Sequence, residues 1–239
     1  MQDVPPRLPL PDTWIRGSNN ILKDDDGTDY QELVDQLFWT HDLDFASSYN
    51  DLFGIYNLLV RCSRHVERDV IDASRQHKPP TLPLWVNVII FRLLTVRPLD
   101  NGPVETAAPG NLVAEAFRLA MLLYMATIWR FYGSHPAHTA VHLRKLRATL
   151  ESPILSTHWC PALRSLQTWV LCTGAMEASF SDQNGLESYF VNTLVKLAVT
   201  DDFISETTRD ILWIPGLFDQ QASMLYQSIQ HVTDMEGYE

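Results

Sequence analysis

The sequence predicts an all-α fold: a multi-helix bundle with a buried central helix near residues 112–132 and an irregular N-terminal arm. Three observations predict it. Residues 119–129 are apolar or uncharged throughout, which is typical of a helix that other helices surround. Most other long segments place apolar side chains at helical spacing, with prolines and glycines between them. No segment shows a convincing strand pattern, so helices are expected to pack on helices.

The N-terminal part of the chain is expected to differ from the rest. Residues 1–28 contain several prolines and run into the acidic stretch KDDDGTD, a composition typical of an extended or loop-like arm. A short helix is predicted from Tyr30 to Trp39. Residues 29–239 are expected to form one helical domain, although the length of 239 residues is also compatible with two small ones.

Two helices are predicted before the central one. The first covers residues 49–76, where apolar side chains form one stripe at helical spacing, and it ends before Pro79 and Pro80. The second covers residues 83–96, PLWVNVIIFRLLTV. Its β-branched residues are compatible with a strand, but its length and its helical neighbours favour a helix.

The central helix carries two charged residues near its start, Glu115 and Arg118, which are expected to pair because residues i and i+3 lie on one helix face. A membrane span is not expected. Only eleven residues separate Arg118 from Arg130, whereas a bilayer requires roughly 20.

The C-terminal half is predicted to contain four or five further helices. Gly174 lies inside one of them, next to small residues, and therefore suggests that another helix packs closely there. Pro161 suits the first position of that same helix. The predicted helices are a basic amphipathic helix over 138–150, a helix over 161–180, a helix in GLESYFVNTLVKLAV, and a final pair from SETTRDILWI through DQQASMLYQSIQHV.

The net charge of −11 disfavours direct nucleic-acid binding by this segment, because the chain would repel a phosphate backbone over most of its surface. Basic residues do gather locally in HLRKLRATL, at His142, Arg144, Lys145 and Arg147. A solvated helix face is the expected role of this group, and contact with phosphate is the alternative.

Cysteine usage and the N-terminal sequence indicate an intracellular protein. The three cysteines, Cys62, Cys160 and Cys172, are odd in number and widely spaced, which argues against a disulfide framework. The first residues, MQDVPPRLPLPDTW, contain no uninterrupted apolar stretch of the kind found in signal peptides.

Four blocks resemble, in this order, a known family. They are NLVAEAFRLAMLLYMATIWR, LRSLQTWVLCTGAMEAS, YFVNTLVKLAV and ILWIPGLFDQQASMLYQSI. Together they cover roughly residues 110–232, and they resemble the fungal-specific transcription factor domain, the all-helical regulatory region of fungal zinc-cluster factors. The residues that carry the resemblance are Glu115, Arg118, Trp169, Gly174 and Glu177, with the aromatic pair Tyr189 and Phe190.

The resemblance implies a nuclear regulatory domain without a cofactor. Such a domain would act through proteins of the transcription machinery, a DNA-binding partner or a small-molecule effector. One departure is important: members of the family usually carry a six-cysteine zinc cluster that contacts DNA, and three scattered cysteines cannot form one. DNA contact would then depend on a segment outside this sequence or on a partner.

The alternative function is a helical enzyme or accessory protein of fungal secondary metabolism. Asp25, Asp26 and Asp29 in DDGTD match the DDxxD pattern with which isoprenoid synthases hold magnesium and diphosphate. The second motif of those enzymes is not matched, since NDLFGIYNL has Gly54 and Leu58 where serine and glutamate are required. A solvated acidic turn is the simpler interpretation.

A group of histidines is a weaker candidate for a metal site. His138 and His142 lie four residues apart with His135 nearby, but the glutamate of a zinc-binding HExxH motif is replaced by Thr139. Surface histidines are therefore expected, and no metal is predicted. The aromatic residues Trp129, Trp169, Trp213, Tyr189 and Phe190 are expected mainly in the core. The alternative is that they line a pocket between the helices.

Overall fold

The computed structural model describes residues 48–76, 80–96, 99, 107–134, 139–157, 159, 163–181, 185–197 and 201–236. Within these ranges all regular secondary structure is helical, as the sequence predicts. The arm expected over 1–28 and the helix expected over Tyr30–Trp39 lie outside them. The helices are α3 (Ser48–Gln76), α4 (Leu84–Thr95), α5 (Pro109–Phe131), α6 (Thr139–Leu150), α7 (Pro153–Ser156), α8 (Arg164–Ser181), α9 (Leu186–Lys196), α10 (Asp201–Ile211) and α11 (Asp219–Glu236).

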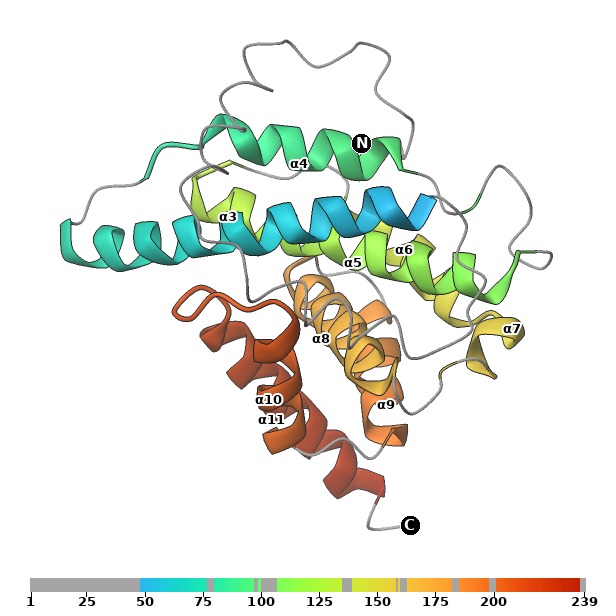
Figure 1. Cartoon of the computed structure of the whole chain (residues 1–239). Coiled ribbons are helices and arrows are strands. Elements are labelled where there is room, and N and C mark those ends of the chain that lie inside the picture. The colour runs from blue at the N-terminus through green and yellow to red at the C-terminus, as the bar shows by residue number, and fades with distance from the viewer. Residues whose placement is uncertain are drawn as a thin grey trace.

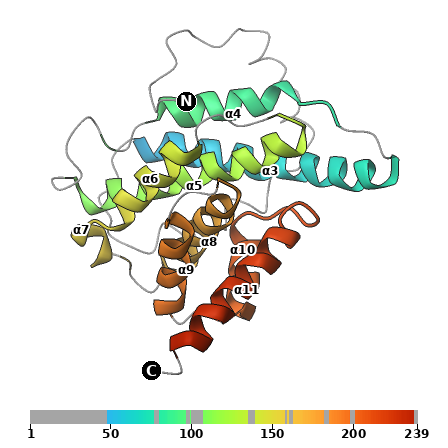
Figure 2. The same ribbon diagram turned by 180° about the vertical axis from the view of Figure 1, so that it is seen from behind.

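The helices form two groups that cross at a steep angle. Helices α3, α4, α5 and α6 run roughly side by side, and α8 to α11 extend away from them (Figure 1). The same two groups are seen from behind in Figure 2. Helix α5 contacts α3, α4, α6, α7 and α8, so it joins the two groups and is the central helix of the fold.

Helix α5 begins and ends at clear sequence signals. Pro109 is its first residue, where the missing N–H of proline is no loss. At its end Gly133 has a φ of 74°, a conformation that glycine adopts without strain. The backbone N–H of Gly133 donates to the Arg130 carbonyl at 2.9 Å and that of Ser134 to the Trp129 carbonyl at 3.1 Å. These two bonds form a Schellman motif, which ends the helix.

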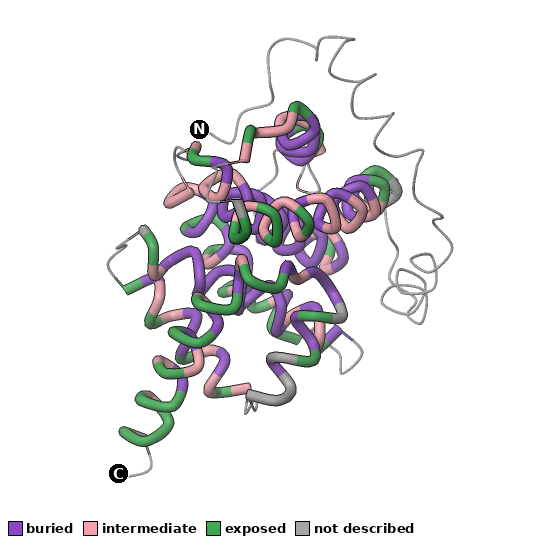
Figure 3. The backbone as a smooth tube through the Cα atoms, turned by 90° about the vertical axis from the view of Figure 1, so that its left-hand side faces the viewer, coloured by how far each residue is buried: buried purple, intermediate pink, exposed green. Residues whose placement is uncertain are grey.

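Helix α5 is long and apolar enough to cross a membrane by length and composition alone, but 94% of its most apolar 18-residue window is buried inside the structure. Buried residues run through the interior of both helix groups (Figure 3). The predicted buried central helix near 112–132 is therefore confirmed, and α3, α4, α6 and α8 are its cover.

The stripe predicted for the first long helix faces the core. Its apolar residues from Leu52 to Val66 are at most 5% exposed. The 83–96 segment is the helix α4 and not a strand. The helix predicted over 161–180 is α8, described from Arg164, and its expected first residue, Pro161, lies outside the described residues. The one-turn helix α7 was not predicted. Four residues are too few to show a helical period.

A continuous row of aromatic rings connects the two groups. The Phe117 ring of α5 lies 5.8 Å from Trp169 of α8 in an edge-to-face arrangement. Tyr124 stacks on Phe218, with ring centroids 4.8 Å apart, and Tyr56 of α3 approaches Phe117 at 5.5 Å. Aromatic pairs of this kind add to the area that the rings bury. They join α3, α5, α8 and the connection before α11.

Candidate functional site

The first part of the candidate site is a buried ion pair at the start of α5. Arg118 is 1% exposed and Glu115 is 6% exposed. The Arg118 Nε donates to Glu115 Oε2 at 2.8 Å, and Nη2 donates to Glu115 Oε1 at 2.7 Å. The pairing predicted from the i, i+3 spacing is therefore confirmed. Both carboxylate oxygens are engaged by one guanidinium, the geometry in which arginine binds carboxylates most strongly.

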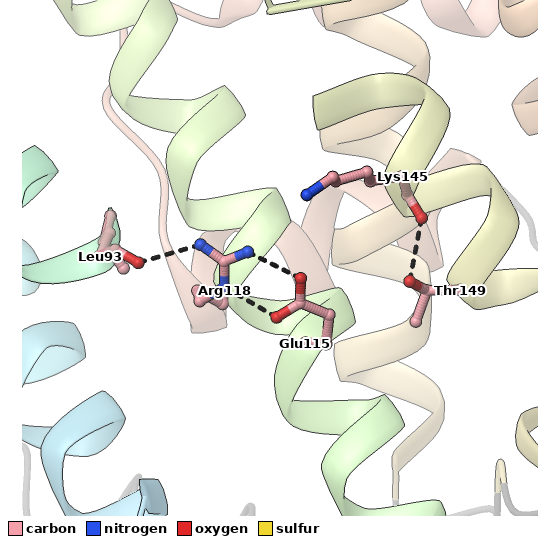
Figure 4. Close-up of polar contacts among 5 residues, drawn as sticks. All are labelled: Leu93, Glu115, Arg118, Lys145 and Thr149. Atoms are coloured by element: carbon pink, nitrogen blue, oxygen red, sulfur yellow. Dashed lines mark hydrogen bonds and ion pairs between the residues drawn. The ribbon is translucent and has the colours of Figure 1, made fainter. Parts of the chain in front are cut away.

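The same guanidinium also reaches a second helix. Arg118 Nη1 donates to the backbone carbonyl of Leu93 at 3.0 Å, and Figure 4 shows Arg118 lying between Leu93 of α4 and Glu115. Leu93 belongs to the last turn of α4, whose carbonyls have no partner inside the helix. A positive charge at this end also complements the helix dipole. Arg118 therefore caps α4 and fixes it to α5.

A second ion pair joins α5 to α8. Arg130 Nη1 donates to Glu177 Oε1 at 2.9 Å, and Nη2 contacts Glu177 Oε2. Nη2 also donates to the Thr127 hydroxyl at 3.1 Å, and the guanidinium lies 4.8 Å from the centre of the Phe180 ring. The carboxylate is 2% exposed, so Arg130 provides the charge that its burial requires.

Trp169 and Gly174 also make contacts between helices. Trp169 is 1% exposed, and its indole Nε1 donates to the Leu212 carbonyl after α10 at 3.0 Å. A Cβ atom at Gly174 would lie 2.7 Å from the Phe190 ring of α9. The close helix contact predicted at Gly174 is confirmed. Only glycine leaves room for that ring.

The buried cysteine thiols are held in their neutral forms. Burial raises the pKa of the Cys62 thiol to about 12, although the nearby Arg61 opposes this shift. Burial also raises the pKa of Cys172. Because the thiolate is the nucleophile, both thiols are inert near neutral pH and act as small apolar core residues.

Only some of the candidate metal-ligating residues lie among the described residues. Asp25, Asp26 and Asp29, like His135 and His138, lie outside the described residues. Among the described residues, no group of three or more His, Cys, Asp or Glu side chains could hold a metal ion. His142 is 6% exposed, so the prediction of a surface histidine there is wrong. It lies on the face of α6 that packs inward with Leu143 and Leu146.

The rest of the basic segment behaves as predicted. Arg144 and Lys145 are exposed. Arg147 forms an ion pair with Glu151 at 2.8 Å, with both side chains at least 40% exposed. The guanidinium of Arg147 also lies 4.9 Å from the centre of the Tyr189 ring. This face of α6 is therefore a solvated, positively charged surface.

Pockets between the described helices include the following two. One, of about 290 Å³, lies between α8, α9 and α11, and the other, of about 330 Å³, lies between α3 and α4. Of the two roles considered for the aromatic residues, core packing and pocket lining, the second is not seen: Trp129, Trp169 and Phe190 line neither pocket. The larger aromatic side chains are used in core packing instead. Methionine, glutamine and serine dominate the pocket beside α11.

Comparison with known proteins gives no relative: no family model, curated protein or solved structure matches this chain.

Proposed function

We propose that this chain is a regulatory helical domain of the fungal-specific transcription factor type, which acts in the nucleus through contacts with other proteins. The proposal rests on the four blocks between residues 110 and 232, which follow one another in the order found in that family. It includes no cofactor and no contact between this segment and DNA.

The observation that carries the proposal is the position of the residues that define the blocks. Glu115 with Arg118 joins α5 to α4, Glu177 joins α8 to α5, and Gly174 lets α9 approach α8. Each of these residues has a role in helix packing that a shared fold would require. These polar residues therefore serve helix packing, which is what we expect of a regulatory domain and not of a catalytic site.

The positively charged face of α6 is the proposed contact surface. Arg144 and Lys145 are exposed there, in a chain whose net charge is −11. Charged groups on the rim of an interface steer association and fix orientation. An acidic segment of a protein partner complements this face.

A reporter assay tests the proposal. The chain is fused to an unrelated DNA-binding domain in a fungal strain that carries the matching reporter gene. We expect the fusion to change reporter output, and the double variant Arg144→Glu/Lys145→Glu to reduce that change while its thermal unfolding stays as in the parent. A folded, nuclear fusion that leaves the reporter unchanged would count against the proposal.

The alternative proposal is a helical enzyme or accessory protein of secondary metabolism, and the DDGTD motif supports it. Magnesium and inorganic diphosphate binding is measured by calorimetry on the full chain and on the triple variant Asp25→Ala/Asp26→Ala/Asp29→Ala. The alternative expects binding in the parent and its loss in the variant. Equal heats for both proteins would eliminate it.

A further inference from the structure

The pocket beside α11 has an apolar base and a polar rim. Ala175 and Met176 from α8 and Leu225 from α11 are each at most 7% exposed and form its buried part. The other lining residues are more polar or more exposed: Ser179, Glu187, Gln221, Met224, Gln227, Ser228 and His231. Met224 is 52% exposed and lies at the open side of the pocket, where a ligand could cover it.

The charge of the pocket is set by one carboxylate. Among its described lining residues, Glu187 is the only acidic one, none is a lysine or an arginine, and His231 is the other ionisable group. Glu187 lies in the first turn of α9, where the helix dipole favours a negative charge. With a net charge of −11 on the whole chain, the surrounding field also attracts cations.

A hydrogen-bond acceptor in the pocket wall lacks a donor. The side-chain carbonyl oxygen of Gln221 is buried and has no hydrogen-bond partner among the described residues. A buried acceptor that remains unsatisfied costs roughly 1–3 kcal/mol, and such groups in native proteins call for an explanation. Because this oxygen has almost no accessible surface, a ligand N–H donor in the pocket would reach it, and remove this cost, only after the Gln221 side chain turns.

We propose that this pocket binds a small molecule with an apolar body and a protonated amine. The apolar body packs on Met176 and Met224, whose flexible, polarizable side chains adapt to irregular shapes. The ammonium group has three N–H donors. They are directed at the Glu187 carboxylate, and a turn of the Gln221 side chain would bring its carbonyl oxygen to the same ammonium group.

The volume of the pocket limits the ligand to one ring or a short chain. At about 290 Å³ it lies near the lower end of the range of about 300–1,000 Å³ for ligand pockets. Residues from α8, α9 and α11 line it together. A bound ligand therefore stabilises the packing of α11 on the other two helices by mass action.

Methyl NMR of methionine tests the proposal on the full chain. Of six methionines, Met176 and Met224 line the pocket, Met121 and Met125 are buried in α5, and Met235 is exposed near the end of α11. The probes are 2-phenylethylamine, the neutral 2-phenylethanol and the anionic 3-phenylpropionate. We expect the amine to shift the Met176 and Met224 signals, with an affinity at least about threefold above that of either other probe, the effect of one accessible ion pair.

Two variants locate the charge effect. Glu187→Gln should lower the affinity for the amine to that of the alcohol, whereas Glu206→Gln, which removes the same charge from an exposed site on α10 outside the lining, should leave it unchanged. The proposal is overturned if the amine shifts neither pocket methionine, if it shifts only Met235, or if the carboxylate probe binds as well as the amine. Unchanged amine binding in Glu187→Gln overturns it as well.

The pocket proposal goes beyond the transcriptional one and does not depend on it. Probe binding is measured on the purified chain, and the reporter effect is measured in cells. Failure of either experiment leaves the other result intact.

Discussion

The guanidinium of Arg118 is shielded from water and bonds to two helices at once. Replacing Arg118 with methionine preserves the length of the side chain but removes its charge, which leaves the Glu115 carboxylate buried without its partner. We expect Arg118→Met to lower the free energy of unfolding by about 3–5 kcal/mol, the usual cost of breaking a buried ion pair. Urea unfolding followed by circular dichroism at pH 7 measures this change.

Two comparisons establish the cause of that loss. Arg147→Met removes an arginine of the exposed pair with Glu151 and should cost less than about 1 kcal/mol. The double variant Glu115→Leu/Arg118→Met should be more stable than Arg118→Met, because no uncompensated charge is left. Equal losses in Arg118→Met and Arg147→Met would contradict this account.

Replacing glycine with alanine is expected to change stability in opposite directions at Gly174 and at Gly54. In Gly174→Ala the new methyl group would lie 2.7 Å from the Phe190 ring, so we expect a loss of about 1–3 kcal/mol from overpacking. In Gly54→Ala, on α3, nothing lies within 4 Å of the added atom. There we expect a gain of up to about 1 kcal/mol, because alanine favours the helix. Thermal unfolding of both variants measures the difference, and a stabilising Gly174→Ala would refute the close contact.

At the scale of whole helices, the Arg130–Glu177 pair connects α5 with α8. A double-mutant cycle of Arg130→Met and Glu177→Gln should give a coupling energy of about 1–3 kcal/mol, since contacting residues in one network are not additive. The matched cycle, Arg147→Met with Glu151→Gln, joins two residues of one exposed turn and should give less than about 1 kcal/mol. Chemical denaturation gives both values. A coupling near zero in the first cycle would mean that the helices are held together by apolar packing alone.

Helices and their order could be predicted well from the sequence, because each long element has its own period and its own stop signals. The ion pair of Glu115 with Arg118 was also predictable, since three residues separate its partners. The contacts of Arg118 with Leu93 and of Arg130 with Glu177 join residues 25 and 47 positions apart. Nothing local in the sequence specifies such pairs.

Other parts of the site depended on the packing of neighbouring helices. His142 lies in a segment rich in arginine and lysine, which favoured a solvated position, yet it falls on the inward side of α6 beside Leu143. The pocket beside α11 combines residues from three helices. No single stretch of sequence contains enough of them to indicate a site.

For the molecule as a whole, burial of thiol and phenol groups in neutral form predicts a loss of stability at alkaline pH. The Cys62 thiol has a pKa raised from 9.0 to about 12 by burial. Its contribution to stability is complete below pH 9 and is lost as the pH rises toward 12, because only the unfolded chain releases the proton in that window. For one such group the slope is about 1.4 kcal/mol per pH unit.

The variant Cys62→Ala isolates this contribution. Its free energy of unfolding should fall less steeply than that of the parent between pH 9 and 11, by about 1.4 kcal/mol per pH unit for the missing thiol. Buried tyrosines such as Tyr124, whose pKa burial also raises, preserve part of the slope in both proteins. Urea titrations at fixed pH values across this range provide the comparison. Parallel slopes would contradict the shifted pKa of Cys62.

The contact between Gly174 and Phe190 also constrains how the sequence can diverge. Two positions sixteen residues apart share one fixed volume, so a larger side chain at 174 becomes acceptable only after a smaller one has replaced the ring at 190. The two substitutions can therefore accumulate in only one order without a loss of stability. In lineages that descend from this protein, we expect the reduction at 190 to precede any enlargement at 174.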